Sequence, residues 1–256
     1  MIHPTAVISD SATMADDVEI GPFTVIGDHV DIGGGTRIES HVVVKGPTKI
    51  GKDNHIYQFA SIGDDPQDKK YANEPTRLTI GDRNTIREYC TISRGTIQDA
   101  GDTFVGDDNW IMAYCHIAHD CVVGSHTIMA NGATLAGHVH LGDWVICGGN
   151  SGIHQFCKIG AHAFLGMHTG VNRDVPAYTL ASGQPAVPKG INSEGLKRRG
   201  FSTDQIRNIK NAYRLVYRKG HKLAEAIERI ESVLDEQQEL LPFLDSLRSS
   251  ERGIIR

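Results

Sequence analysis

The sequence predicts a mainly β fold, in which a parallel β-helix of hexapeptide repeats is followed by a C-terminal α-helical domain. The first observation is an apolar residue at every sixth position from Ile2 to Val171, with two interruptions. The second is the glycine or other small residue that often follows the apolar one. The third is a change from six-residue to helical spacing near the end of the chain. These observations place the β-helix in residues 1–187 and the helical domain in residues 188–256.

The six-residue repeat is unbroken in one long stretch: Val105, Ile111, Ile117, Val123, Met129, Leu135, Leu141, Cys147, Ile153, Ile159, Leu165 and Val171. A helix repeats near 3.6 residues and a simple strand at two, so neither produces this pattern alone. In a β-helix each hexapeptide forms one short strand and one turn, and three of them close a coil. Coils stack about 4.8 Å apart, and the repeat corresponds to about nine of them. A β-sandwich with accidental periodicity is the alternative, which the constant phase disfavours.

Two insertions interrupt the repeat. The first, near residues 64–78, is polar and contains two prolines, and the second lies near residues 95–103. Long loops on a rigid scaffold commonly bind ligands, whereas a plain surface excursion is the alternative for each of them.

The C-terminal segment changes character after a proline-rich crossover at residues 174–188. The sequence STDQ at residues 202–205 is typical of a capping box, and it predicts a helix that ends by Gly220. A second helix is predicted from apolar residues at helical spacing: Leu223, Ile227, Ile230 and Leu234. A short third helix is predicted after Pro242. Open coil ends expose strand edges, so a helical cap is physically required.

Composition excludes several classes of function. The chain is 39% hydrophobic and 22% charged, and its net charge of −5 argues against nucleic acid as the main partner. No apolar run is long enough to span a membrane, and the N-terminus does not resemble a signal peptide. The five cysteines are an odd number without C-x-x-C spacing, so we expect reduced thiols and a cytoplasmic location.

Residues 18 positions apart should stack on successive coils, which brings several polar residues together. Two adjacent columns result: His119, Gly137 and Gln155; and Asp120, His138 and Phe156. His119 and His138 are therefore expected about one coil apart, with His116 and His154 along the same edge. We expect this cluster to project from turns rather than from the apolar interior.

Three interpretations of the cluster compete. The residues could be ordinary polar corner residues, or several histidines could bind zinc. The third interpretation is general-base catalysis, because a neutral histidine can take a proton from a hydroxyl near pH 7. Asp120 could then orient His119, and the backbone N–H of Gly137 could face a developing oxyanion.

Six segments carry a resemblance that covers nearly the whole chain: residues 66–71 (PQDKKY), 116–121 (HIAHDC), 135–139 (LAGHV), 153–157 (IHQFC), 192–201 (NSEGLKRRGF) and 252–256 (RGIIR). Together they resemble the UDP-N-acetylglucosamine O-acyltransferases, a family of hexapeptide-repeat transferases with a left-handed parallel β-helix. Members of that family make the first committed compound of lipid A in Gram-negative bacteria.

The resemblance implies a role for each of these residues. His119 would be the general base on the glucosamine 3-hydroxyl, which attacks the thioester of a 3-hydroxyacyl acyl carrier protein directly, without an acyl-enzyme. Asp120 would support His119, and the Gly137 amide would stabilise the oxyanion. The residues implied in substrate binding are Asp68, Lys70, His116, His138, His154, Gln155, Asn192, Glu194 and Arg198. Arg198 is the natural phosphate partner.

The same resemblance implies the partners. These are acyl carrier protein, which presents the acyl group on phosphopantetheine, and UDP-N-acetylglucosamine, with no separate cofactor and no metal. It also implies a homotrimer with sites between prisms. The basic run at residues 197–199 could attract an acidic carrier protein, or it could be an ordinary solvated face.

Met167 is the main departure from the family pattern. Some members carry glycine here and accept a chain of about 14 carbons, whereas a methionine side chain would exclude about four of them, because packed apolar sites tolerate little extra volume. The expected donor is therefore 3-hydroxydecanoyl acyl carrier protein. The alternative is that Met167 is flexible and swings aside.

Two related activities and one structural role are the alternatives. Carbonic anhydrases of the γ class use this fold with zinc, but the candidate ligands here lack the His-x4-His spacing of that family. The later UDP-acylglucosamine N-acyltransferase places a uridine-binding domain before its prism, and we expect none here because the repeat begins at Ile2. A purely structural prism would not need the polar loop, the histidine cluster or the basic run.

Overall fold

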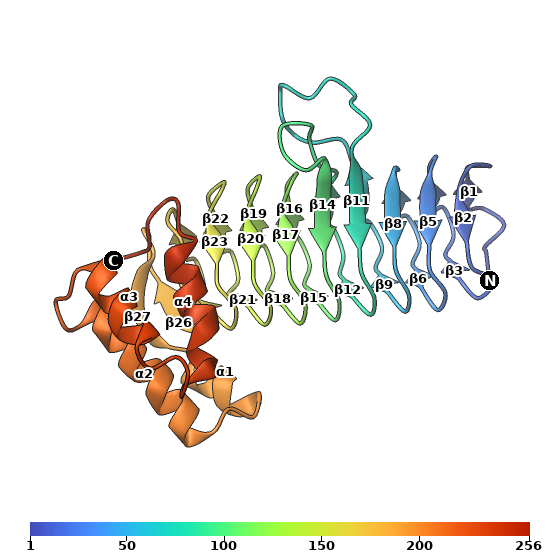
Figure 1. The fold of residues 1–256 in the computed structure, drawn as a ribbon. Helices are drawn as coiled ribbons and strands as arrows, with labels where there is room; N and C mark the ends of the chain where they lie inside the picture. Colours follow the sequence, from blue (N-terminus) through green and yellow to red (C-terminus); the bar gives the residue numbers. More distant parts are fainter.

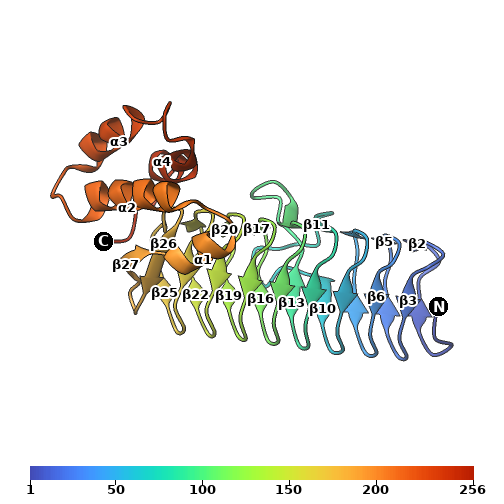
Figure 2. The ribbon, with the colours of Figure 1, turned by 90° about the horizontal axis from the view of Figure 1, so that it is seen from below.

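The computed structural model describes all residues, 1–256, and shows a triangular prism with a helical segment at one end (Figures 1 and 2). Three parallel sheets form the sides of the prism. Sheet I contains β1 (Val7–Ile8), β4 (Val25–Ile26), β7 (Val43–Val44), β10 (Ser61–Asp64), β13 (Thr91–Ser93), β16 (His116–Ile117), β19 (Thr134–Leu135), β22 (Gly152–Ile153) and β25 (Gly170–Val171).

Sheets II and III form the other two sides. Sheet II contains β2 (Thr13–Met14), β5 (Val30–Ile32), β8 (Thr48–Ile50), β11 (Arg77–Ile80), β14 (Asp102–Val105), β17 (Val122–Val123), β20 (His140–Leu141) and β23 (Lys158–Ile159). Sheet III contains β3 (Glu19–Ile20), β6 (Arg37–Ile38), β9 (His55–Ile56), β12 (Thr85–Ile86), β15 (Trp110–Ile111), β18 (Ile128–Met129), β21 (Ile146–Cys147), β24 (Phe164–Leu165), β26 (Thr179–Ser182) and β27 (Val187–Ile191).

The apolar residue of each hexapeptide fills the prism. These residues are 0–2% exposed from Ile20 to Val171, and they form one continuous core cluster. Ile8 and Met14 are half-buried and Ile2 is 49% exposed, because the first coil is stacked on one side only. The predicted periodicity is therefore confirmed.

The prism has three corners, which we name by the sheets that they join in chain order: corner I/II, corner II/III and corner III/I. Most corner turns contain one non-glycine residue with φ between +54° and +65°. Because the coils stack in register, the residues at these positions form columns, and their rings stack on one another, as Tyr89 and Tyr114 do at 4.9 Å.

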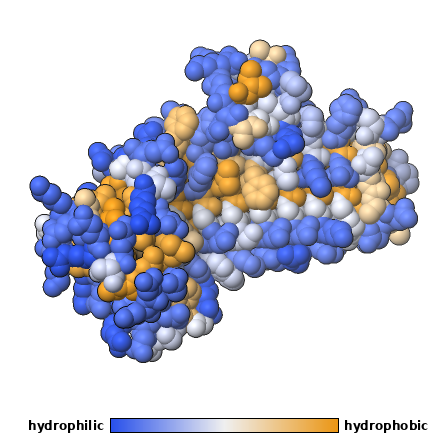
Figure 3. All heavy atoms as spheres, viewed as in Figure 1, coloured by the Kyte–Doolittle hydropathy of each residue, from blue (hydrophilic) through white to orange (hydrophobic).

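Both insertions leave the prism at corner I/II. The first connects β10 to β11 and the second connects β13 to β14, and together they form the projection seen above the prism in Figure 1. Arg94, only 7% exposed, connects the first insertion to the prism. Its guanidinium donates to the Gly46 and Gly63 carbonyls of the prism and to the Tyr71 hydroxyl of the insertion. Figure 3 shows that the projection is mainly hydrophilic, whereas apolar residues gather along the prism face beside it.

The C-terminal segment closes the end of the prism. The helices are α1 (Ser193–Arg198), α2 (Thr203–Tyr217), α3 (Leu223–Glu231), the 3-10 helix η1 (Gln238–Leu240) and α4 (Leu241–Arg248). They pack around a second apolar cluster that includes Tyr178 and Phe243. None of the helices combines the length and apolar character needed to cross a bilayer.

The predicted capping box is confirmed at the start of α2, where the Ser202 hydroxyl accepts from the Gln205 N–H and the Gln205 side chain accepts from the Ser202 N–H. Three details differ from expectation. Helix α1 was not predicted, because its six residues are too few to show helical periodicity. Leu234 lies in a turn beyond the end of α3, yet it still packs on the second cluster.

The third difference is at the predicted crossover, where β26 and β27 pair as an antiparallel hairpin on sheet III. Strand β27 runs across the boundary placed between residues 187 and 188. That division into two domains stays a prediction.

Candidate active site

A cluster of polar side chains lies at corner I/II beside the second insertion. The turn after β16 carries His119 and Asp120, and the turn one coil later carries Gly137 and His138. The His119 and His138 rings meet edge to face, with their centroids 5.1 Å apart. The expectation that these two histidines lie about one coil apart on the same side is confirmed.

Asp120 is the buried carboxylate of the cluster, with 2% of its surface exposed. Its φ of +58° is a conformation that aspartate tolerates better than most residues. The Nδ1 atom of His119 lies 2.8 Å from Oδ2 of Asp120. In a neutral ring this contact places the proton on Nδ1, so the lone pair of His119 is on Nε2.

The second insertion holds Asp120 in place. Thr96 donates its N–H to Oδ1 at 2.8 Å and its hydroxyl to Oδ2 at 2.7 Å. The N–H of Asp120 in turn donates to the Thr103 hydroxyl at 2.8 Å. Burial raises the pKa of Asp120, but the hydrogen bonds from His119 and Thr96 and the charge of His138 outweigh it and hold that pKa below its ordinary value. The carboxylate is therefore ionised beside His119 near neutral pH.

His138 is stacked on one aromatic ring and has a carboxylate oxygen near each ring nitrogen. Its ring stacks on Phe156 with centroids 4.4 Å apart, and it has a φ of +61°. Nδ1 lies 2.9 Å from Oδ2 of Asp99, a residue of the second insertion, and Nε2 lies 3.8 Å from Oδ2 of Asp120. His138 thus connects the insertion to the His119–Asp120 pair.

Gly137 is required at its position because the His119 ring lies against its Cα. A Cβ added there would come within 2.6 Å of Cε1 and 2.8 Å of Nε2 of His119. The Gly137 N–H lies in a turn and donates to no other protein group. A free donor therefore lies next to the lone-pair edge of the imidazole.

His116 lies on β16 itself rather than in a turn, which corrects the expectation that the whole cluster projects from turns. Its side chain points outward from sheet I because successive strand residues face opposite sides. Nδ1 lies 2.7 Å from the Thr91 hydroxyl. Burial, and then the charge of His119, lowers the pKa of His116, which favours a neutral ring.

The outer face of sheet I forms a polar track beside the cluster. Its outward residues are in register from coil to coil: Ser61, Thr91, His116, Thr134, Gly152 and Gly170. At one end of the track is a small cavity of about 250 Å³ beside the first insertion. At the other end is a groove of about 610 Å³.

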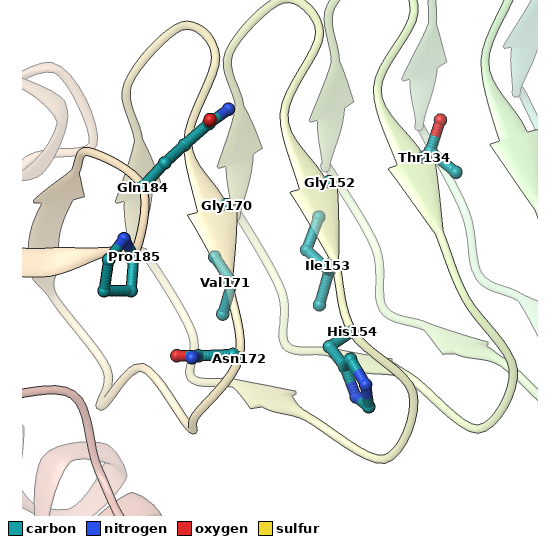
Figure 4. A pocket seen from close by; sticks show the side chains of 9 residues that line it. All are labelled: Thr134, Gly152, Ile153, His154, Gly170, Val171, Asn172, Gln184 and Pro185. Carbon is teal, nitrogen blue, oxygen red and sulfur yellow. The ribbon is translucent and has the colours of Figure 1, made fainter.

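The larger groove is open because two glycines form its floor. A Cβ on Gly152 would meet no atom within 4 Å. Figure 4 shows Thr134 at one end, Gln184 and Pro185 at the other, and His154 with Asn172 along one edge. Of the predicted binding residues, the groove contains His154.

Of the other predicted residues, Gln155 lies at the same corner one coil beyond Gly137, as its column predicts, whereas the rest lie apart from the cluster within a single chain. Asp68 and Lys70 form a turn on the first insertion, in which the Lys70 N–H donates to Asp68 at 3.0 Å. Gln155 is exposed at corner I/II. Met167 is 69% exposed at corner III/I, a different corner from that of His119.

Asn192, which caps helix α1, and Glu194 and Arg198 within the helix lie at corner II/III. Asn192 caps the helix by accepting from the Gly195 N–H, and it donates to the His162 carbonyl at 3.0 Å. Glu194 and Arg198 are exposed, and Glu194 pairs with Lys197 at 2.9 Å. One chain therefore does not bring the α1 residues to His119.

Sequence reasoning missed the residues that hold the cluster. Thr96 and Asp99 belong to an insertion without periodicity, so no column predicts their contacts. The only available signal was the insertion itself, whose position in the repeat places it at the same corner as Asp120. Gln184 of the groove was also missed, because it belongs to the hairpin that replaced the expected crossover.

The arrangement can remove a proton from a hydroxyl and stabilise a negative oxygen beside it. His119 offers a lone pair on Nε2, Asp120 stabilises the imidazolium that forms, and the Gly137 N–H is a free donor. His119, Asp120 and His138 also offer ligand atoms within 4.8 Å of one another that could hold a metal ion.

Comparisons with known proteins agree along the whole chain. A family model described as UDP N-acetylglucosamine O-acyltransferase, domain 2, matches residues 174–255, and one for the bacterial transferase hexapeptide (six repeats) matches residues 102–137. The acyl-[acyl-carrier-protein]–UDP-N-acetylglucosamine O-acyltransferase of Thiobacillus denitrificans is 60% identical over 100% of this chain and 99% of its own length. The enzyme of the same name from Pseudomonas putida is 54% identical over the same shares.

Solved structures share the fold. LpxA from Acinetobacter baumannii superposes with a TM-score of 0.98 at 51% identity, covering 100% of this chain and 99% of that one. The UDP-N-acetylglucosamine acyltransferase of Francisella novicida gives 0.98 at 47% identity, covering 100% and 94%. The predicted fold, a left-handed parallel β-helix with a C-terminal helical segment, is confirmed.

Proposed function

The chain belongs to the family of UDP-N-acetylglucosamine O-acyltransferases, and we propose that it performs their reaction with His119 as the general base. It is an acyl-[acyl-carrier-protein]-dependent O-acyltransferase that acts on UDP-N-acetylglucosamine, and the product enters lipid A synthesis at its first step. Neither the zinc enzyme nor the N-acyltransferase alternative is favoured by these relatives. The observation that carries the mechanism is the His119–Asp120 pair held by Thr96 beside a free Gly137 N–H.

The reaction proceeds by direct attack. Nε2 of His119 takes the proton of the glucosamine 3-hydroxyl as its oxygen bonds to the thioester carbonyl carbon. The Gly137 N–H stabilises the oxyanion of the tetrahedral intermediate. When the C–S bond breaks, the imidazolium returns the proton to the departing phosphopantetheine thiol, so His119 ends as it began. No cysteine supplies a nucleophile, since all five are buried.

The remaining predicted residues bind the two substrates in this proposal. His116, His138, His154 and Gln155 follow the polar track and its corner, and Asp68 and Lys70 reach from the first insertion. Asn192, Glu194 and Arg198 bind the sugar nucleotide from α1. Arg198 is exposed and makes no ion pair, so its guanidinium is free for a phosphate. We propose no additional cofactor, and a cytoplasmic location fits five free thiols.

A homotrimer completes the site in this proposal. The predicted residues lie at three different corners of one prism, so a single chain cannot surround one substrate with all of them. Corner III/I also exposes a ladder of stacked rings in which Phe59, Tyr89 and Tyr114 are each 47–64% exposed. Exposed apolar patches of this kind mark protein contacts. Light scattering of the pure protein measures the mass, and a mass of one chain would contradict the trimer.

The activity is tested by mixing the protein with UDP-N-acetylglucosamine and acyl carrier protein thioesters of several chain lengths. We expect acyl sugar nucleotide by mass spectrometry, with the acyl group on the 3-hydroxyl. Turnover should survive thorough chelation of metals. Hydrolysis of the thioester without an acyl sugar would contradict the transferase assignment.

Chain length is tested at Met167. The exposed side chain lies over Gly149, with Cγ 3.8 Å from where a Cβ would be, so it narrows the end of any groove between two prisms. We expect a preference for 3-hydroxydecanoyl donors. Met167→Gly should move the optimum to chains about four carbons longer, since each methylene is worth about 0.8 kcal/mol and four shift the preference by about two orders of magnitude. Met167→Leu is the control, and an unchanged profile in the glycine variant would refute the ruler.

A further inference from the structure

We propose that His119, Asp120 and His138 form a binding site for a divalent transition-metal ion such as Zn²⁺, and that its occupancy blocks acyl transfer. One nitrogen of each ring and one carboxylate oxygen lie within 4.8 Å of one another. Oδ2 of Asp120 is the common point, 2.8 Å from Nδ1 of His119 and 3.8 Å from Nε2 of His138.

These separations match what zinc requires. With bonds of about 2.0–2.2 Å in a tetrahedral arrangement, two ligand atoms lie about 3.3 Å apart. The two distances to Oδ2 of Asp120, 2.8 and 3.8 Å, bracket that value, and the two imidazole nitrogens lie within 4.8 Å of each other. Rotation of the imidazole rings would have to bring these nitrogens closer when the ion binds. Two imidazoles, one carboxylate and an open fourth position are a common ligand set for zinc.

The outer contacts are those that hold metal ligands in place. His138 directs Nε2 toward Asp120 while its other nitrogen, Nδ1, faces Oδ2 of Asp99 at 2.9 Å. A carboxylate on the second nitrogen fixes the ring and raises its basicity as a ligand. Thr96 donates two hydrogen bonds to Asp120, so the carboxylate is also held. The second insertion therefore positions two of the three ligands.

Occupancy would stop catalysis through the tautomer of His119. A metal on Nδ1 displaces the proton that this nitrogen shares with Asp120. In a neutral ring the only remaining proton position is Nε2, so the lone pair that accepts the substrate proton is lost. The metal also neutralises Asp120. The blocking effect rests on the proposed role of His119 as general base, whereas the binding itself does not.

Binding is tested on the free enzyme with Co²⁺, whose visible absorption reports a four- or five-coordinate site, followed by displacement with Zn²⁺. We expect one ion per chain at this site. His138→Asn should abolish the absorption, and His126→Asn should leave it unchanged. The two variants are matched, because both histidines have a positive φ that asparagine accepts, 61° and 58°, and both stack on an aromatic ring.

Asp99→Asn should weaken metal binding without abolishing it. Loss of the carboxylate behind His138 should weaken Co²⁺ binding about 10- to 100-fold, and the Zn²⁺ concentration for half-inhibition should rise by the same factor. Binding that His138→Asn leaves intact would overturn the site, and the base assignment would be untouched. Full activity of wild-type enzyme with the site loaded would overturn the block and the base assignment together.

Discussion

Corner I/II and corner II/III have the same backbone but different chemistry. Each carries a column of residues with positive φ at 18-residue spacing, and each stacks a histidine on an aromatic ring. His138 lies on Phe156 with centroids 4.4 Å apart, and His126 lies on Trp144 at 4.1 Å. The repeat alone would make the two corners equivalent.

The difference is in the segment that covers each corner. The second insertion brings the hydroxyl of Thr96 and the carboxylate of Asp99 to corner I/II, where they contact Asp120 and His138. Against the effect of burial, the hydrogen bonds from His119 and Thr96 hold the pKa of Asp120 below its ordinary value. At corner II/III the covering residues are Arg199 and Phe201, which pack on His162. Burial, and then the charge of Arg199, lowers the pKa of His162 to about 4 against the pull of Asp143.

In this β-helix, the repeat determines where a corner residue lies, whereas the segment that covers the corner determines how reactive that residue is. A polar cover makes one histidine column a candidate for proton transfer, while a cationic and aromatic cover turns the other into a docking surface for α1. Four sets of matched substitutions test this difference, from the largest expected effect to the smallest.

Substituting one histidine at each corner should show the largest difference in turnover between corner I/II and corner II/III. His119→Gln removes the base, and turnover should fall roughly 10²- to 10⁴-fold. His126→Asn at corner II/III should leave turnover unchanged, because the half-buried His126 side chain stacks on Trp144 and lies 3.9 Å from Asp108, at a different corner from His119. The measurement is the steady-state rate of each variant, and equal melting temperatures show that both variants are folded. Near-normal turnover in His119→Gln would refute the mechanism.

The polar cover is tested at Thr96. Thr96→Val keeps the shape but removes a hydrogen bond to the Asp120 carboxylate, worth about 1.5–3 kcal/mol, so turnover should fall about 10- to 100-fold. Thr96→Ser should restore it. Thr127→Val is the matched control, since this buried hydroxyl donates to the neutral Asn109 side chain at 2.7 Å. If Thr127→Val reduced turnover as much, general destabilisation would explain both.

Two neighbouring arginines at the end of α1 distinguish substrate binding from the packing of α1 on corner II/III. Arg198 is exposed, and Arg198→Ala should raise KM for UDP-N-acetylglucosamine about 10-fold or more, since a lost bond to a charged group costs about 1.5–3 kcal/mol. Arg199 lies 5.1 Å above the Trp144 ring and 3.1 Å from Nδ1 of His162. Arg199→Ala should mainly lower the melting temperature. The opposite assignment of the two effects would exclude a phosphate role for Arg198.

The smallest effect concerns His162 and pH. Its folded pKa of about 4 lies below the ordinary 6.5, so the unfolded chain binds more protons between these values. The free energy of unfolding should therefore decrease as pH falls from about 6.5 toward 4. His162→Asn should reduce this slope, measured by urea unfolding at several pH values. His126→Asn provides the comparison, and equal slopes in the two variants would contradict the assignment.

Much of the fold and part of the site could be predicted because both follow from a local repeat. An apolar residue every six positions determines which side chains face inward, and the 18-residue column then places His119 against Gly137 and His138 against Phe156. The capping box at Ser202 is equally local, since both of its hydrogen bonds close within four residues. The roles of the site residues stay predictions that came with the family resemblance.

The tertiary structure alone decided what covers each corner. Thr96 and Asp99 reach Asp120 and His138 across 24 and 39 residues of sequence, and nothing in an aperiodic loop predicts those partners. The same holds for α1, which is too short for periodicity and is held at corner II/III by Asn192 and Arg199. Contacts between successive coils recur every 18 residues, so they can be predicted from residue numbers alone. Contacts between an insertion and the prism depend on the path of the loop in space.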